Sequence, residues 1–126
     1  MKRAAAIALA LLAWSSAASA GTATRETIGE RSVRVYVPSK QAEPRALVLM
    51  LHGCTQDADG FAGATRMDEV AEENGFVVAY PEQTSQQALN ACWQWWDPAH
   101  QKRDAGEPKE LAAIADAVAQ THGAPM

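Results

Sequence analysis

The sequence has 126 residues, of which 48% are hydrophobic and 21% are charged, and its formal net charge is −4. This length gives room for one small domain with a modest core. The acidic balance argues against nucleic acid or an anionic membrane surface as a partner, because both attract basic proteins.

The first twenty residues have the pattern of a secretory signal peptide. A basic start, Lys2-Arg3, is followed by an apolar run over residues 4–14 and by the small-residue cleavage pattern Ala18-Ser19-Ala20. The apolar run is too short to span a bilayer, which takes about 20 residues. We therefore predict cleavage before Gly21 and a secreted product, extracellular or periplasmic. Without Lys2-Arg3 the mature part has nine basic and fifteen acidic residues, a charge of −6.

The mature chain begins with a predicted antiparallel hairpin. The segments TATRETI and RSVRVYV flank a Gly29-Glu30 turn, and three valines of the second segment alternate with polar neighbours. Such alternation places one face of a hairpin on a core and leaves the other in water. A polar loop with two prolines, Pro38 to Arg45, follows.

The pattern then changes to two buried strands joined by a helix. Ala46–Leu51 and Phe76–Tyr80 are apolar without alternation, as expected for strands covered on both faces in a parallel sheet. Between them we predict a helix over Phe61–Asn74 that stops at Asn74-Gly75. Its apolar face would carry Ala64, Met67, Val70 and Ala71. Strand, helix and strand together make a right-handed crossover unit.

After Pro81 the sequence is irregular up to Gly106, and this long stretch carries three tryptophans. Loops of this length in compact domains are usually functional or disordered, and the tryptophans argue against disorder. A last helix is predicted to start at Pro108 and to stop at Gly123. Its buried face would carry Leu111, Ile114, Ala115, Val118 and Ala119.

Cys54 and Cys92 are the only cysteines of the sequence. In an exported protein an even pair more often forms a disulfide than two free thiols, so we predict a Cys54–Cys92 bridge. The alternative is a Cys/His metal site, but two cysteines 38 positions apart with no close histidine pair fit no zinc spacing. No metal or cofactor is expected.

Four motifs, taken in order, give the sequence a family resemblance. They are LVLMLHGCTQ, TRMDEVAEENGFVVAYPEQ, CWQWWDP and GEPKELAAIADAV. Together they resemble the amino-terminal part of the esterase family that includes polyhydroxybutyrate depolymerases and their relatives among feruloyl and acetylxylan esterases. The resemblance spans nearly the whole mature chain. It implies a secreted serine esterase that opens ester bonds through an acyl-enzyme, with a Ser/His/Asp triad.

For the fold, the resemblance implies an α/β architecture, namely a truncated α/β-hydrolase fold. Residues 21–126 would form the amino-terminal part of the esterase domain: the antiparallel hairpin, then strand, helix, strand and helix, with the nucleophile strand absent. In that fold Ala46–Leu51 is a central strand, so its apolar edge would be bare and the chain marginally stable. The Cys54–Cys92 bridge would offset this by about 3 to 4 kcal/mol.

For the site, the resemblance assigns an oxyanion-hole loop made of His52, Gly53, Cys54 and Thr55. One donor for the developing oxyanion would be the backbone N–H of Cys54 or of Thr55. The predicted disulfide would tie this loop to the tryptophans. Trp95 and Trp96 would then form an apolar platform for a polyester or an aromatic ester, or they would simply fill space, which is the reading we favour for Trp93.

No nucleophile is visible in the sequence. None of its serines lies in a Gly-x-Ser-x-Gly elbow; they are Ser15, Ser16, Ser19, Ser32, Ser39 and Ser85. The catalytic triad is therefore expected to be missing from this chain. His52 is assigned to the oxyanion loop, and His100 and His122 are predicted to be solvated, so none of the histidines is taken as the catalytic base.

Two functions follow from these features. The first is an amino-terminal fragment of a secreted serine esterase of the polyhydroxybutyrate depolymerase type, inactive alone, whose complete form acts on a polyester or a small carboxylic ester. The second is a secreted non-catalytic binding module, or a subunit completed by another chain. A self-sufficient module would be expected to protect its apolar central strand, and no segment is free to do so, which favours the first function.

Overall fold

A computed structural model describes residues 20–39, 44 and 46–125. The predicted signal peptide lies outside the described residues except for Ala20, and so does most of the loop between Pro38 and Arg45. Among the described residues, no helix has both the length and the apolar character needed to cross a membrane.

The hairpin forms as predicted, with strand β1 over Thr22–Ile28 and strand β2 over Arg31–Val37. The two strands pair antiparallel along their whole length, from Thr22 opposite Val37 to Ile28 opposite Arg31. The turn uses Gly29 at φ 61°, a left-handed conformation that glycine adopts without steric cost. Alternate residues of β2, such as Val33 and Val35, are fully buried, as the sequence pattern required. The prediction that the other face lies in water is wrong for β2, because Tyr36 on that face is 8% exposed and packs in a core with helical residues of the segment 58–71.

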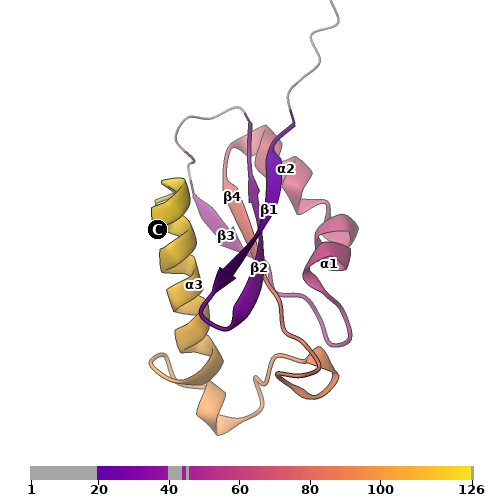
Figure 1. The fold of residues 1–126 in the computed structure, drawn as a ribbon, viewed down its shortest axis with the longest axis vertical. Helices are drawn as coiled ribbons and strands as arrows, with labels where there is room; N and C mark the ends of the chain where they lie inside the picture. The colour runs from indigo at the N-terminus through magenta and orange to yellow at the C-terminus, as the bar shows by residue number, and fades with distance from the viewer. Residues whose placement is uncertain (1–19, 40–43, 45, 126) are drawn as a thin grey trace, which may run out of the picture.

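The hairpin belongs to a four-stranded mixed sheet of order β1-β2-β4-β3 (Figure 1). Strand β4, Val77–Pro81, pairs antiparallel with β2 and parallel with β3, Leu47–Leu49. Strand β3 is shorter than predicted, and its side chains are only partly buried. The reason is that, along the described residues, β3 is paired with β4 on one side alone, so its other edge contributes no burial.

The single helix predicted over Phe61–Asn74 is wrong, because the structure has two helices, α1 over Ala58–Thr65 and α2 over Met67–Asn74. The chain breaks at Arg66, which has φ 53° and donates its N–H to the carbonyl of Ala62. The break changes the helical phase.

The change of phase alters which side chains of α1 and α2 are buried. Ala64 and Val70 are exposed, whereas Ala62, Met67 and Ala71 pack toward the sheet. Helix α2 does end as predicted, with Gly75 at φ 72°.

Helix α3, Gly106–His122, covers the opposite face of the sheet, so the molecule has three layers (Figure 1). It begins two residues before the predicted start at Pro108, and it stops as predicted, with its last residue at His122 and Gly123 as the cap. The core under α3 is aliphatic and consists of Val33, Val35, Val77, Ala79, Ile114, Val118 and Ala124. The core under α1 and α2 contains two tyrosines and consists of Tyr36, Ala58, Ala62, Ala71, Val78 and Tyr80.

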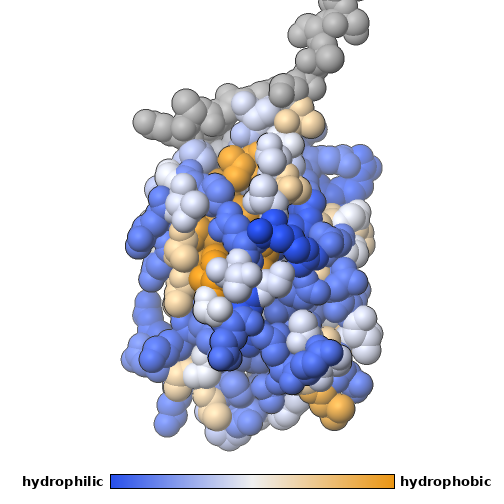
Figure 2. Space-filling model, in the orientation of Figure 1, coloured by the Kyte–Doolittle hydropathy of each residue, from blue (hydrophilic) through white to orange (hydrophobic). Residues whose placement is uncertain are grey.

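The surface seen in Figure 2 is largely hydrophilic, with apolar residues gathered in its middle, where the strands lie beside α3. Between β4 and α3 the chain is irregular, as expected, apart from two short 3₁₀ turns, η1 over Leu89–Ala91 and η2 over Pro98–His100. This segment and the loop after β3 leave the sheet at the same edge, which is where sheets of α/β proteins carry their sites.

Candidate functional site

The predicted oxyanion loop, residues 52–55, begins three residues after the last residue of β3, at the carboxyl edge of the parallel β3–β4 pair. Its first residue, His52, is only 2% exposed. The backbone N–H of Gln83 donates to Nε2 of His52 at 3.0 Å, and Nδ1 of His52 lies 2.8 Å from the carbonyl oxygen of Gly53. Since a backbone N–H can only donate, the ring proton must sit on Nδ1. Both ring nitrogens are thus engaged, and neither is free to act as a general base.

The two candidate oxyanion donors differ in their hydrogen bonding. The N–H of Thr55 donates to the carbonyl of Asn90 at 2.7 Å, so it is not available to a ligand. The N–H of Cys54 has no acceptor among the residues that the structure describes. Of the two alternatives left open by the sequence, the geometry therefore favours Cys54.

The predicted disulfide is present and joins Cys54 to Cys92, with their Cα atoms 4.2 Å apart. Together with the Thr55–Asn90 hydrogen bond it fastens the oxyanion loop to the irregular segment. Thr55, Asn90 and Ala91, all beside this junction, have positive φ angles between 52° and 63°. Such backbone conformations are uncommon outside glycine and cluster at functional sites.

The three tryptophans of the irregular segment divide into one interior and two exposed residues. Trp93 is half-buried, with the guanidinium of Arg31 4.9 Å from its ring centroid and the ring of His52 at 6.0 Å. It fills space, as predicted. Trp95 and Trp96 are 74% and 51% exposed and meet edge to face, with ring centroids 5.7 Å apart.

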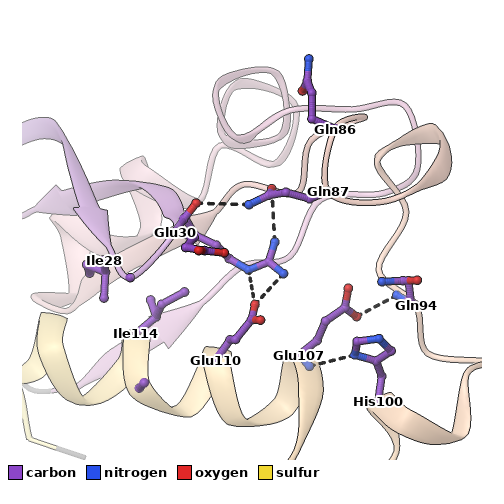
Figure 3. A pocket seen from close by; sticks show the side chains of 12 residues that line it. Ile28, Glu30, Gln86, Gln87, Gln94, His100, Glu107, Glu110 and Ile114 are labelled. Carbon is purple, nitrogen blue, oxygen red and sulfur yellow. Dashed lines mark hydrogen bonds and ion pairs between the residues drawn. The ribbon is translucent and has the colours of Figure 1, made fainter.

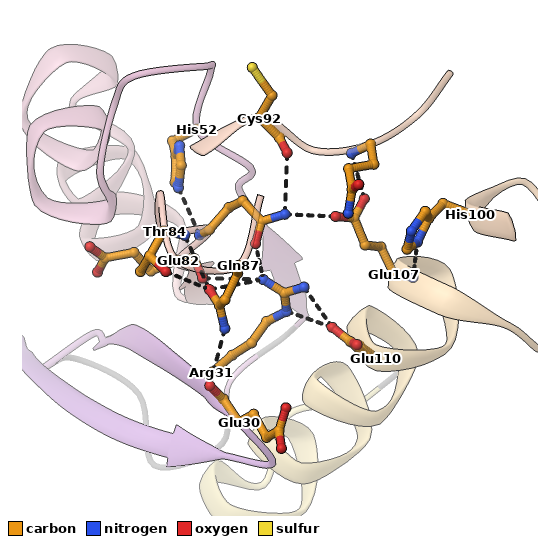
Figure 4. Close-up of polar contacts among 12 residues, drawn as sticks. Glu30, Arg31, His52, Glu82, Thr84, Gln87, Cys92, His100, Glu107 and Glu110 are labelled. Carbon is orange, nitrogen blue, oxygen red and sulfur yellow. Dashed lines mark hydrogen bonds and ion pairs between the residues drawn. The ribbon is translucent and has the colours of Figure 1, made fainter. Parts of the chain in front are cut away.

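A buried polar cluster, which the sequence analysis missed, lies beneath the two loops (Figure 4). Gln83, Glu107 and Arg31 are 1%, 5% and 6% exposed. The amide of Gln83 donates to Glu107 at 2.7 Å and to the carbonyl of Cys92 at 3.2 Å, and it accepts from Arg31 at 2.5 Å. Polar residues of these types are mostly exposed in proteins, so nothing in the sequence marked them as buried.

A cavity of about 610 Å³ opens beside this cluster, between the hairpin turn and the start of α3 (Figure 3). Its polar lining includes the carboxylates of Glu30, Glu107 and Glu110, and Arg31 pairs with Glu110 at 2.6 Å. None of residues 52–55 lines it. The cavity is therefore not the oxyanion site.

The other two histidines are only partly exposed and each has a hydrogen-bond partner, so the prediction that they are solvated holds only in part. His122 lies at the end of α3 with Nε2 2.6 Å from a carboxylate oxygen of Glu26 on β1. His100 is half-buried, and its Nδ1 accepts the N–H of Glu107 at 2.9 Å, in the first turn of α3. His100 binds the first turn of α3, and His122 lies in its last turn and binds Glu26. These partners are distant in sequence or depend on where α3 begins and ends, so the sequence could not show them. The described residues hold no group of three or more His, Cys, Asp or Glu suited to a metal ion.

Comparisons with known proteins agree with the resemblance found in the sequence. Residues 31–124 match the family described as "Esterase PHB depolymerase". Poly(3-hydroxyalkanoate) depolymerase C of Paucimonas lemoignei is 32% identical over 69% of this chain and 21% of its own length. Feruloyl esterase B of Neurospora crassa is 35% identical over 56% of this chain and 23% of its own length. The chain thus spans less than a quarter of these relatives.

Two solved structures are similar in fold. Acetyl xylan esterase from Aspergillus awamori has a TM-score of 0.72 and 22% identity, over 83% of this chain and 39% of that one. Poly(aspartic acid) hydrolase-1 from Sphingomonas sp. KT-1 has a TM-score of 0.53 and 16% identity, over 85% and 43%. Because the family match covers well over half of the sequence, the chain belongs to the Esterase PHB depolymerase family.

Proposed function

We propose that this chain is the amino-terminal part of a secreted serine esterase of the polyhydroxybutyrate depolymerase type and supplies one side of its oxyanion hole. On this proposal the sheet and its helices are the first half of an α/β-hydrolase fold. Membership of the family and the names of the relatives support an ester-hydrolysing site. The observation that carries the proposal is the Cys54 N–H, which has no acceptor among the described residues and lies in a loop at the sheet edge.

The chemistry assigned to Cys54 is electrostatic stabilisation. When a serine attacks an ester carbonyl, the carbonyl oxygen becomes negatively charged, and backbone N–H groups placed about 3 Å away stabilise it. One such donor contributes about 3 to 4 kcal/mol to the transition state. The donor lowers a barrier only if a nucleophile is present, and no serine of this sequence lies in a nucleophile elbow. We therefore propose that residues 21–126 alone do not hydrolyse esters.

A fluorophosphonate probe, which labels activated serines, tests this proposal on the protein as its own source secretes it. The labelled protein is digested and mapped by mass spectrometry. We expect peptides from residues 21–126 together with a labelled serine outside them. Labelling of Ser32, Ser39 or Ser85 would contradict the proposal, and so would serine-dependent turnover of p-nitrophenyl butyrate by the isolated chain.

A second candidate function is a secreted binding module without catalysis, or a subunit completed by another chain. It is supported by the exposure of Trp95 and Trp96, since two large aromatic side chains in water at one place often mark a contact surface. The same labelling, with the intact mass of the protein measured before digestion, separates the two. A secreted product with the mass of residues 21–126 and no labelled serine supports the second function.

A further inference from the structure

We propose that Gln83 is a positioning residue that fixes the direction of the oxyanion donor. It holds the Gly53–Cys54 peptide from both sides, through His52 on one side and through the disulfide partner of Cys54 on the other. The inference rests on the proposed function for the role of the Cys54 N–H. The contacts themselves are independent of it.

The first hold acts through the backbone of Gln83. Its N–H donates to Nε2 of His52, which leaves the proton on Nδ1, and Nδ1 then donates to the carbonyl of Gly53 at 2.8 Å. The N–H of Gln56 reaches the same carbonyl at 3.2 Å. The Gly53 carbonyl therefore receives two donors and has little freedom to rotate.

The direction of the Cys54 N–H follows from peptide geometry. The Gly53 carbonyl and the Cys54 N–H belong to one planar peptide, which is trans like every other described peptide bond, and the two groups point in opposite directions. Fixing the carbonyl toward His52 thus aims the N–H away from it. Hydrogen bonds to a carbonyl also polarise its amide, which strengthens the N–H as a donor.

The second hold acts through the side chain of Gln83, whose partners Arg31, Cys92 and Glu107 are labelled in Figure 4. One amide hydrogen goes to the carbonyl of Cys92, whose sulfur is bonded to Cys54, and the other goes to Glu107. The amide oxygen accepts from Arg31. Both N–H groups and the oxygen of this 1% exposed amide have partners, so the amide is locked in one orientation.

The carboxylate of Glu107 is fixed in turn. Its second oxygen accepts the backbone N–H of Gln94 at 2.7 Å, and its own N–H donates to His100. The first turn of α3 therefore sets the position of the Gln83 amide. Glu107 of helix α3 and Arg31 of the hairpin make no hydrogen bond to the oxyanion loop, residues 52–55. Through Gln83, both nevertheless help to fix the position of that loop.

The first test measures the tautomer of His52 by ¹⁵N NMR in oxidised residues 21–126 near pH 7. We expect Nδ1 to carry the proton and Nε2 to show the shift of an unprotonated nitrogen. A proton on Nε2, or an average of both tautomers, would overturn the proposal. If His52 were merely buried and did not orient the Gly53 carbonyl, it would have no reason to adopt a single tautomer.

The second test is Gln83→Glu, with Gln86→Glu as the matched control on an exposed glutamine. The change replaces the NH₂ group, which makes both donated bonds, by one carboxylate oxygen that can only accept and that faces Glu107 and the Cys92 carbonyl. Arg31 is the cation at this position, and it is shared with Glu110. We expect exchange of the Thr55 amide to rise about tenfold, the equivalent of one lost hydrogen bond, and the Cys54 amide resonance to shift.

The pH dependence gives this variant a signature of its own. The introduced carboxyl regains one donor when it is protonated, so the effect of Gln83→Glu should shrink as the pH falls from 7 to 5. Equal spectra and exchange rates for Gln83→Glu and Gln86→Glu would overturn the proposal. If Gln83→Glu fails to fold, the His52 tautomer decides. Neither measurement uses hydrolysis, so failure here is distinct from failure of the proposed function.

Discussion

The oxyanion loop and the exposed tryptophan pair are joined by one disulfide, yet they are held in very different ways. The loop makes hydrogen bonds to Gln83 and Asn90, both distant in sequence, and its histidine is buried. Among the described residues, Trp95 and Trp96 themselves make only local hydrogen bonds, such as that from the Gln101 side chain to the Trp95 carbonyl at 3.0 Å, although the neighbouring Gln94 N–H reaches Glu107.

This contrast matches the demands of the two proposed tasks. Stabilising an oxyanion requires a donor held to within about 0.5 Å, which only fixed neighbours provide. Contact with a polymer surface tolerates movement, because apolar contact is not directional. The chain thus places the proposed chemical group on a loop held by residues distant in sequence, and the proposed recognition group on two exposed side chains whose own hydrogen bonds are local.

Removing the disulfide should have the largest effect, because it is the covalent link between the two regions. Replacing both Cys54 and Cys92 by serine should lower the free energy of unfolding by about 3 to 4 kcal/mol, as expected for a closed loop of this length. Urea unfolding followed by tryptophan fluorescence measures it, with the reduced wild-type chain as the control. A loss below about 1 kcal/mol would mean that hydrogen bonds alone anchor the loop.

Alkaline pH should destabilise the core around Tyr36 and, as a consequence, the oxyanion loop. Burial, and then the hydrogen bond to Glu72, raise the pKa of Tyr36 to about 12 from 10. A raised pKa means that the stabilisation is complete below pH 10 and is lost as the pH approaches 12. We expect a fall on the order of 2 kcal/mol over this range, less in Tyr36→Phe.

The alkaline titration also separates the two regions. Strand β4 ends two residues before Gln83 and is paired with β2, the strand of Tyr36. Exchange of the Thr55 amide should therefore rise together with unfolding of the core. Tryptophan amides at positions 95 and 96 should exchange rapidly already at pH 8. Protection of these amides equal to that of Thr55 would remove the contrast between the loops.

A single histidine substitution should show the anchoring within the loop. His52→Phe leaves the buried Gln83 N–H without its acceptor, which costs about 2 kcal/mol, whereas the Gly53 carbonyl keeps the N–H of Gln56. His122→Phe is the matched control. It removes a half-buried pair with Glu26 and should cost less than about 1 kcal/mol. Equal losses in thermal or urea unfolding would mean that His52 is held no more firmly than His122.

The sequence was sufficient wherever local signals decide the structure. Strand alternation located β1 and β2, the glycines at 75 and 123 marked helix ends, and the even cysteine count gave the disulfide. Each of these depends on neighbours in the chain or on the compartment. The helix break at Arg66 was not predicted, because the apolar periodicity of the sequence continues through it. No glycine or proline marks the residue that adopts the left-handed conformation.

The position of the candidate site could be predicted from the sequence, but the hydrogen bonds that hold it in place could not. The motif placed residues 52–55 after a strand, but only the fold brings Asn90 to the N–H of Thr55 and so decides between the two donors. Gln83, Glu107 and Arg31 are buried because they satisfy one another across distant segments. Such mutual burial has no periodicity, and each residue alone would be predicted on the surface.

The smallest change in stability, but a clear change in binding, is expected at the tryptophan pair. Trp95→Ala with Trp96→Ala should alter the free energy of unfolding by less than about 0.5 kcal/mol, because both rings are mostly in water. Adsorption to polyhydroxybutyrate films should weaken about tenfold, since each ring loses contact with the polymer. Depletion from solution at several protein concentrations measures this affinity.

Leu89→Ala is the control for that experiment, because Leu89 is 81% exposed but is not one of the paired rings. An equal loss with Leu89→Ala would show general hydrophobic adsorption and no platform. Insoluble xylan gives a further contrast. The two rings meet at 86°, so they offer no flat strip for stacked sugar rings, and we expect weaker adsorption to xylan than to the polyester. Stronger adsorption to xylan would show that the pair serves a carbohydrate and would reverse the substrate class proposed for this surface.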